Sequence, residues 1–110
     1  MKKKQTNRDS EGVWLFGDYR NYFQNRVTLQ LLAKGKDLAK KLGAEVTVLL
    51  LGDHVHQYAM EYVAHGADIV VVADHPNLKD YQVETYTRIV SRLVEHYRPE
   101  VFIAGATAFG

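Results

Sequence analysis

The sequence of 110 residues predicts an α/β fold with three layers, in which helices cover both faces of an open, doubly wound parallel sheet. Four short apolar runs alternate with helical patterns along the chain, which is the order of elements in βαβ units. The runs are continuous and rich in leucine and β-branched residues, as in strands that are buried on both faces. The spacing between them suits right-handed crossovers, and we expect the fourth strand to lie beside the first.

The first expected strand covers residues 12–18 and ends in glycine and aspartate. A helix over residues 28–42 follows, because apolar residues recur there at intervals of three and four. Gly43 is a suitable residue to end this helix, and residues 45–51 form the second expected strand. The apolar stripe of the helix contains a glycine among its larger members: Leu31, Leu32, Gly35, Leu38, Ala39 and Leu42.

The second helix is expected over residues 55–65, with Asp53 as its N-terminal cap and Gly66 as its stop. Residues 68–74 form the third expected strand. This strand is bounded by an aspartate at each end, and a turn containing proline follows it. The strand therefore connects the second helix to the third.

The third helix is expected over residues 81–98, where it is ended by Pro99, and residues 100–106 form the fourth strand. All of these elements belong to one expected domain, residues 12–110. Residues 1–11 are polar and carry several lysines, which favours a disordered basic tail.

The composition excludes several function classes. A net charge of +1 indicates no nucleic-acid partner, and no apolar run approaches the length of a membrane span. There is no cysteine, which excludes disulfides and thiol catalysis. No nucleophile stands beside a base, and no pair of carboxylates flanks a pocket, so we expect a chain that is not catalytic alone. The pair His54 and His56 lacks further ligands at suitable spacing, and no metal site is expected.

A nucleotide-binding crevice is the most specific functional site that the ends of the expected strands suggest. Ligands of such sheets bind beyond the carboxyl ends of the strands, where the strand order reverses. Small residues there would let backbone N–H groups approach a phosphate, although "GATAFG" lacks the lysine of a phosphate-binding loop. Close packing of strand and helix is the preferred explanation of the small residues at 105, 106 and 108. The candidate residues are Gly17, Asp18, Gly105, Ala106, Thr107 and Gly110.

An aromatic cluster follows the first strand. Tyr19, Tyr22 and Phe23 lie in an expected polar loop that no core stripe explains, so they suggest either a partner surface or packing within the loop. Other tyrosines fall on expected core stripes rather than in a stacking site for nucleotides: Tyr58, Tyr62, Tyr86 and Tyr97.

Several stretches taken in order carry a family resemblance: "VWLFGDYR", "VTLQLLAKGKDLAKKLGAEVTVLLLGD", "EYVAHGADIVVVADHPNLKDYQVETYT" and "YRPEVFIAGATAFG". Over residues 13–110 the chain resembles the N-terminal domain of the electron transfer flavoprotein α subunit. The resemblance implies a Rossmann-like sheet with the topology of the adenine-nucleotide hydrolases, here truncated at Gly110. The segment "GDYRNYFQNRV" departs from the acidic segment usual in the family, which puts the choice of partner in doubt.

The resemblance also implies a function. The α subunit pairs with an electron transfer flavoprotein β subunit, and the FAD-containing heterodimer carries electrons between dehydrogenases, such as those acting on acyl-CoA, and a downstream acceptor. FAD is held chiefly by the C-terminal domain of α, so none is expected in this chain alone. A bacterial cytoplasmic location is expected. The alternative is a free-standing adenine-nucleotide-binding module of the universal-stress type.

Overall fold

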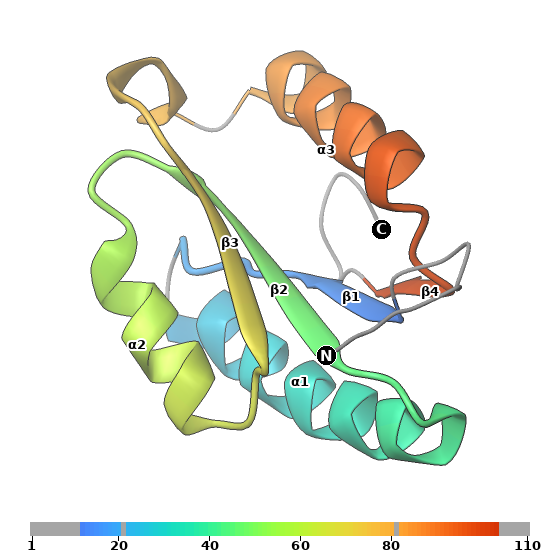
Figure 1. Ribbon diagram of the computed structural model, residues 1–110. Helices are drawn as coiled ribbons and strands as arrows, with labels where there is room; N and C mark the ends of the chain where they lie inside the picture. Colours follow the sequence, from blue (N-terminus) through green and yellow to red (C-terminus); the bar gives the residue numbers. More distant parts are fainter. Residues whose placement is uncertain (1–11, 21, 81, 104–110) are drawn as a thin grey trace.

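A computed structural model describes the chain over residues 12–20, 22–80 and 82–103. Strands and helices alternate in the expected order, and a short 3₁₀ turn, η1, precedes the last helix (Figure 1). The expected tail, residues 1–11, lies outside the described residues. The elements are β1 (Val13–Phe16), α1 (Tyr22–Leu42), β2 (Val46–Gly52), α2 (His56–Ala64), β3 (Ile69–Asp74), η1 (Pro76–Leu78), α3 (Val83–Tyr97) and β4 (Val101–Ile103).

The four strands form one parallel sheet in the order β3-β2-β1-β4. Val13 of β1 pairs with Val46 of β2 on one side and with Val101 of β4 on the other. Helices α1 and α2 cover one face of the sheet, and α3 covers the opposite face (Figure 1). The expected doubly wound α/β architecture, with the fourth strand beside the first, is confirmed.

The two central strands are buried at every position, which explains why their apolar runs are continuous. Successive side chains alternate between two core clusters. Val13 and Leu15 face the layer of α1 and α2, whereas Trp14 and Phe16 face α3. On the α3 side the Trp14 ring packs against Tyr97, with ring centroids 5.1 Å apart. Each face of the sheet therefore has its own core.

Helix α1 begins at Tyr22 and not at residue 28, so the expected polar loop is largely helical. Its first turns are held by polar contacts, which an apolar stripe does not reveal. The Asn25 side chain accepts a hydrogen bond from the Tyr62 hydroxyl (2.7 Å) and donates one to Glu61 (3.0 Å). Thr28 is also buried, although it is polar. The sequence prediction was wrong here because periodicity measures apolar burial only.

The helix stops follow the expected chemistry. Gly43 and Gly66 adopt positive φ angles of 65° and 112°, which glycine tolerates without steric cost. Helix α3 ends just before the expected boundary at Pro99. Strand β4 is seen over Val101–Ile103, and the rest of the expected fourth strand lies outside the described residues. No helix in the described part of the chain is both long and apolar enough to cross a membrane.

Gly35 provides a test of how closely α1 packs on the sheet. A Cβ atom built there would lie 3.6 Å from Ile103 Cδ1 and 3.7 Å from Val13 Cγ1, which are ordinary contacts. Gly35→Ala is therefore expected to stabilise the fold by up to about 1 kcal/mol through helix propensity. Gly35→Leu has no room and is expected to destabilise it by about 1–3 kcal/mol. Urea denaturation measures both changes in the free energy of unfolding.

The exposed neighbour Lys34 supplies the control. Lys34→Leu adds the same side chain on the solvent side of α1 and is expected to change the free energy of unfolding by less than about 0.5 kcal/mol. Equal stabilities of the Gly35→Leu and Lys34→Leu proteins would contradict the close approach of α1 to β1 and β4.

Candidate functional site

The carboxyl ends of β1 and β4 lie side by side, as the expected crevice requires. Residues 17–20 follow β1 on one side of this position. The other side belongs to the segment after Ile103, and its candidates lie outside the described residues: Gly105, Ala106, Thr107 and Gly110. The structure therefore describes one half of the candidate site, at the end of β1.

Gly17 is small because an aromatic ring packs on it. A Cβ atom at this position would lie 2.9 Å from Cε2 of Tyr62 and 3.0 Å from a methyl group of Val48. The Gly17 N–H donates to the carbonyl of Leu49 at 2.9 Å. The residue thus leaves no free N–H group for a phosphate, and packing accounts for the glycine.

Asp18 is buried and fully engaged by its neighbours. Its carboxylate receives two hydrogen bonds from the Arg20 guanidinium, at 2.8 Å from Nε and 2.7 Å from Nη2. Its backbone N–H donates to the Thr28 hydroxyl, which in turn donates to the Asp18 carbonyl. This arrangement ties the end of β1 to α1.

Tyr19 fills the space beyond the end of β2. Its ring stacks on Tyr58 of α2 at a centroid distance of 4.6 Å, and its hydroxyl donates to the Leu51 carbonyl at 2.9 Å. A Cβ atom on Gly52 would overlap the Tyr19 hydroxyl and also crowd Val55. Tyr19 therefore packs against the core, and the glycine at the end of β2 is required by this tyrosine.

The expected aromatic cluster divides into separate parts. Tyr19 points inward, whereas Phe23, on the first turn of α1, is 68% exposed. Tyr22 begins the helix, and its side chain is outside the described ones. Of the three aromatic residues in this cluster, Phe23 is the one whose described side chain is exposed and available to a partner.

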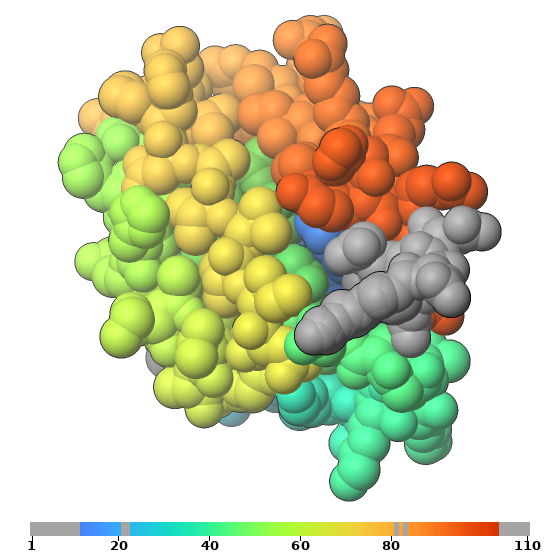
Figure 2. Space-filling model, in the orientation of Figure 1, coloured from blue at the N-terminus to red at the C-terminus, as the bar shows by residue number. Residues whose placement is uncertain are grey.

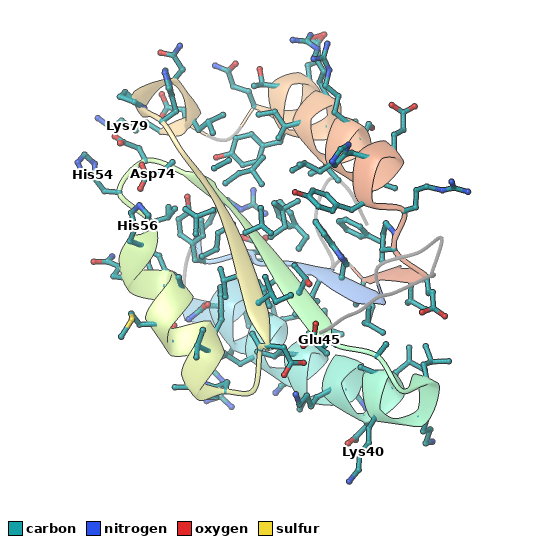
Figure 3. All side chains as sticks on the ribbon, viewed as in Figure 1. Lys40, Glu45, His54, His56, Asp74 and Lys79 are labelled. Atoms are coloured by element: carbon teal, nitrogen blue, oxygen red, sulfur yellow. The ribbon has the colours of Figure 1, made fainter. Side chains whose placement is uncertain are left out.

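Asp74 organises the other end of this sheet edge. Its carboxylate accepts the backbone N–H groups of His54 (2.9 Å) and Val55 (3.1 Å), and the imidazole of His56 lies 3.5 Å away (Figure 3). The hydrogen bond from the His54 N–H is the largest of the influences that hold the pKa of Asp74 below its usual value. The carboxylate at the end of β3 thus fixes the loop that leads into α2.

Sequence reasoning assigned this role to the wrong aspartate. Asp53, the expected cap of α2, instead lies 2.9 Å from the ring of His54. Helix α2 begins after Val55, which makes no side-chain cap. Asp74 is distant from the β2–α2 loop in the sequence. The one sequence feature that could have identified its role is that an aspartate ends the neighbouring strand, β3.

This edge offers no evident place for a metal or a flavin among the residues that the structure describes. No group of three histidine or carboxylate side chains there could hold a metal ion. FAD requires a phosphate cradle, and the N–H groups of Gly17 and Asp18 are already donated within the chain. The described half of the crevice therefore does not fit FAD.

A shallow groove of about 400 Å³ lies at the opposite, amino-terminal edge of the sheet. Lys36 bridges it by an ion pair with Asp68 at 2.8 Å, and Lys40 and Glu45 lie at the same end of the molecule (Figure 3). Charges of both signs line the groove, and among its described lining residues no polar side chain is buried. It gives no indication of a specific ligand.

The Tyr19 contact generates a prediction about alkaline stability. Burial, reinforced by Tyr86, raises the pKa of Tyr19 above its usual value, so the folded protein holds this hydroxyl neutral. The contribution of this hydroxyl to the free energy of unfolding is fully present below about pH 10 and is lost as the pH rises above that value. Tyr19→Phe is expected to reduce this alkaline decline and to lower the free energy of unfolding at neutral pH by about 0.5–1.5 kcal/mol.

Urea denaturation between neutral and alkaline pH measures both effects. Tyr58→Phe is the control, because Tyr58 stacks on Tyr19 and the described contacts assign its hydroxyl no hydrogen bond. An unchanged alkaline slope in Tyr19→Phe would show that the Tyr19 hydroxyl is not held in the folded protein.

Asp74 generates a prediction about acid stability. Its folded-state pKa is lowered, so its contribution is present above about pH 4 and is lost as the pH falls below that value. In Asp74→Asn the amide can accept with one atom only, so one loop N–H loses its partner. The variant is expected to be less stable at neutral pH and to lose less stability on acidification.

Thermal unfolding from neutral to acidic pH tests this expectation. Asp80→Asn removes an equal charge from an exposed position and should leave the acid profile unchanged. If both variants gave the same profile, the role of Asp74 in holding the β2–α2 loop would be disproved.

Comparisons with known proteins identify the family. Residues 13–110 match the model of the electron transfer flavoprotein domain. The chain is 38% identical over 102 residues to electron transfer flavoprotein subunit alpha of Clostridium acetobutylicum, covering 93% of this chain and 30% of that protein. It is 35% identical over 98 residues to acryloyl-CoA reductase electron transfer subunit beta of Anaerotignum propionicum, covering 89% of this chain and 27% of that protein.

A third relative is lactate dehydrogenase (NAD(+),ferredoxin) subunit LctC of Acetobacterium woodii, which is 31% identical over 99 residues, covering 90% of this chain and 24% of that protein. The chain therefore spans less than a third of the length of these curated relatives. The similarity nevertheless extends over nearly the whole chain, in agreement with the resemblance seen in the sequence. The chain belongs to the electron transfer flavoprotein domain family.

Proposed function

We propose that this chain is the N-terminal structural and interaction domain of an electron transfer flavoprotein α subunit. In this role it would form part of a FAD-containing heterodimer that carries electrons between dehydrogenases and a downstream acceptor. The observation that carries the proposal is the 38% identity over 102 residues to an α subunit. The names of two relatives, an acryloyl-CoA reductase subunit and a lactate dehydrogenase subunit, support a role in electron transfer with a dehydrogenase.

The geometry at the sheet edge supports an interaction role over a cofactor role. Tyr62 covers Gly17, Arg20 pairs with Asp18, and Tyr19 occupies the space beside Gly52. In this proposal FAD is held by other parts of the heterodimer, and the domain supplies surface and rigidity. A role in nucleotide binding for Gly105, Ala106, Thr107 and Gly110 stays a prediction, because these residues are outside the described ranges.

The proposed partner is an electron transfer flavoprotein β subunit. Phe23 is exposed and supports a contact surface near the start of α1. Tyr19 packs inward and the side chain of Tyr22 is outside the described ones, so these two residues support the surface less directly. The chain is proposed to have no catalytic activity alone, in keeping with relatives that are electron-transfer subunits. A bacterial cytoplasmic location is a further prediction from the resemblance.

The alternative function was a free-standing adenine-nucleotide-binding module of the universal-stress type. A parallel sheet in this order is compatible with such a module, but the family match and the relatives favour the electron-transfer assignment. The closed end of β1 also argues against nucleotide binding, since its N–H groups are already donated.

A titration of the purified chain tests the proposal. The chain alone is expected to be colourless and to show no binding of FAD, AMP or ATP, because the described crevice offers no free phosphate cradle. Flavin fluorescence follows FAD, and thermal shift follows the two adenine nucleotides. A β subunit added at equal concentration is expected to co-elute with the chain on gel filtration, more weakly than with a full-length α subunit.

The outcomes separate the hypotheses. Micromolar FAD binding by the chain alone would place the flavin site in this domain and overturn the assignment. A thermal shift with AMP or ATP at millimolar concentration or below would favour the nucleotide-binding module. Failure of the β subunit to co-elute would count against the interaction role.

A further inference from the structure

Helix α1 concentrates the positive charge of the domain. It carries five basic residues and one acidic residue, whereas the rest of residues 12–103 carries five basic and ten acidic residues. A helix with an excess of positive charge in an otherwise acidic domain has a surface potential of its own, which attracts a negatively charged partner. Figure 2 shows the C-terminal half of this helix standing out at the lower right of the molecule. The basic residues of α1 are Arg26, Lys34, Lys36, Lys40 and Lys41.

Three of these lysines have no ion pair among the residues that the structure describes. Lys36 is held by Asp68, with 2.8 Å between Nζ and Oδ1. Lys34, Lys40 and Lys41 are exposed and unpaired within the described ranges, and Figure 3 shows Lys40 directed away from the rest of the molecule. The helix dipole accounts for Lys40 and Lys41, which lie in the last turn. Lys34 lies about two turns earlier, so the dipole does not explain it.

Phe23 lies on the same line of α1 as two of these lysines. Lys34 follows Phe23 by 11 residues and Lys41 follows Lys34 by seven, which are close to three and two helical turns. The three side chains therefore form a line along the helix, roughly 27 Å long at the rise of an α-helix. All three are exposed, and the exposed fraction of Phe23 is 68%. We call Phe23, Lys34 and Lys41 the α1 stripe.

We propose that the domain docks on the β subunit of its heterodimer through the α1 stripe, and that the facing surface of the β subunit carries carboxylates and an apolar pocket for Phe23. Carboxylates opposite Lys34 and Lys41 steer and orient the partner, while burial of the Phe23 ring supplies apolar contact area. The inference rests on the proposed function for the existence of this partner, and it adds the contact surface and its chemistry.

The charges around the α1 stripe favour a protein over a nucleic acid. Asp37 lies three residues after Lys34 and four before Lys41, so a carboxylate stands beside both lysines on the helix surface. A continuous row of phosphates would be repelled by this carboxylate and by the acidic remainder of the domain. A protein surface can place its carboxylates opposite the lysines alone, and it can also receive an aromatic ring.

A second copy of the chain fits the α1 stripe less well. Its carboxylates would have to come from the acidic remainder of the domain. There Asp18, Asp68 and Asp74 are already engaged by groups of the same chain. The stripe is therefore assigned to a different protein, whose carboxylates are free to pair with lysine.

The test measures the affinity of the full chain for an electron transfer flavoprotein β subunit by isothermal titration calorimetry. The affinity is expected to fall at least about fivefold between about 50 and about 500 mM NaCl, because salt screens the charges. Lys34→Glu combined with Lys41→Glu is expected to weaken binding at low salt at least about tenfold. Arg88→Glu combined with Arg92→Glu makes the same change of charge at exposed positions of α3, on the opposite face of the sheet, and should leave the affinity within about twofold.

Phe23→Ala tests the apolar anchor without a change of charge. It is expected to weaken binding about tenfold and to leave the salt dependence as it is. Met60→Ala removes an apolar side chain that is 76% exposed on α2 and should leave binding unchanged. Circular dichroism checks that each variant is folded. Phe23→Ala, and Lys34→Glu alone, leave the last turn of α1 intact, so these arms hold even if the double reversal fails to fold.

Three results would overturn this inference and leave the proposed function standing. They are equal binding by the α1 and α3 reversals, binding that salt does not weaken, and full affinity of Phe23→Ala. Absence of binding by the unaltered chain would contradict the proposed function as well, so the two failures are distinguishable. A dimer in sedimentation that Lys34→Glu abolishes would assign the stripe to a second copy, and binding of a DNA duplex lost in the same variant would assign it to a nucleic acid. Either result would reject the β subunit as its occupant.

Discussion

Complete burial of β1 and β2 is the constraint on which the rest of the structure depends. Neither strand has a face left for solvent, so helices must cover both sides of the sheet. Close approach of those helices then dictates small residues at particular places. Gly17 lies under Tyr62, and Gly35 lies against Val13 and Ile103. Gly17 and Gly35 are therefore a consequence of packing, whereas Gly43 and Gly66 are required by their positive φ angles.

The same packing decides what the carboxyl edge can do. A crevice at a strand reversal binds phosphate when its N–H groups are free and its surroundings are not negative. Here the end of β1 donates its N–H groups internally and buries the Asp18 carboxylate beside Arg20. The Tyr19 hydroxyl donates to the Leu51 carbonyl at 2.9 Å, and the Tyr86 hydroxyl, which donates to the Leu78 carbonyl at 2.7 Å, lies 3.3 Å from the same Leu51 oxygen. The fold has the architecture of nucleotide-binding domains, while the described half of the candidate crevice is occupied by the protein's own side chains.

The sequence predicted the fold well because the signals that define it are local. Continuous apolar runs located the strands, and the spacing of leucines located most of α1. The start of α1 was missed because Asn25 and Thr28 are held by hydrogen bonds, which leave no apolar period. The role of Asp74 was missed because its partners, His54 and Val55, are close only in the folded chain.

Apolarity alone does not give the position of a strand in the sheet; the expected pairing of the fourth strand with the first came from the crossover connections. The run from Ile69 to Ala73 is as apolar as β2, yet β2 is central and β3 is an edge. Apolarity on both faces explains why each strand is flanked by helices, but it carries no information about lateral neighbours. Lateral pairing depends on backbone groups, which every residue except proline possesses. Among the residues that the structure describes, the N–H groups at the end of β1 are donated within the chain, and β3 has one neighbouring strand.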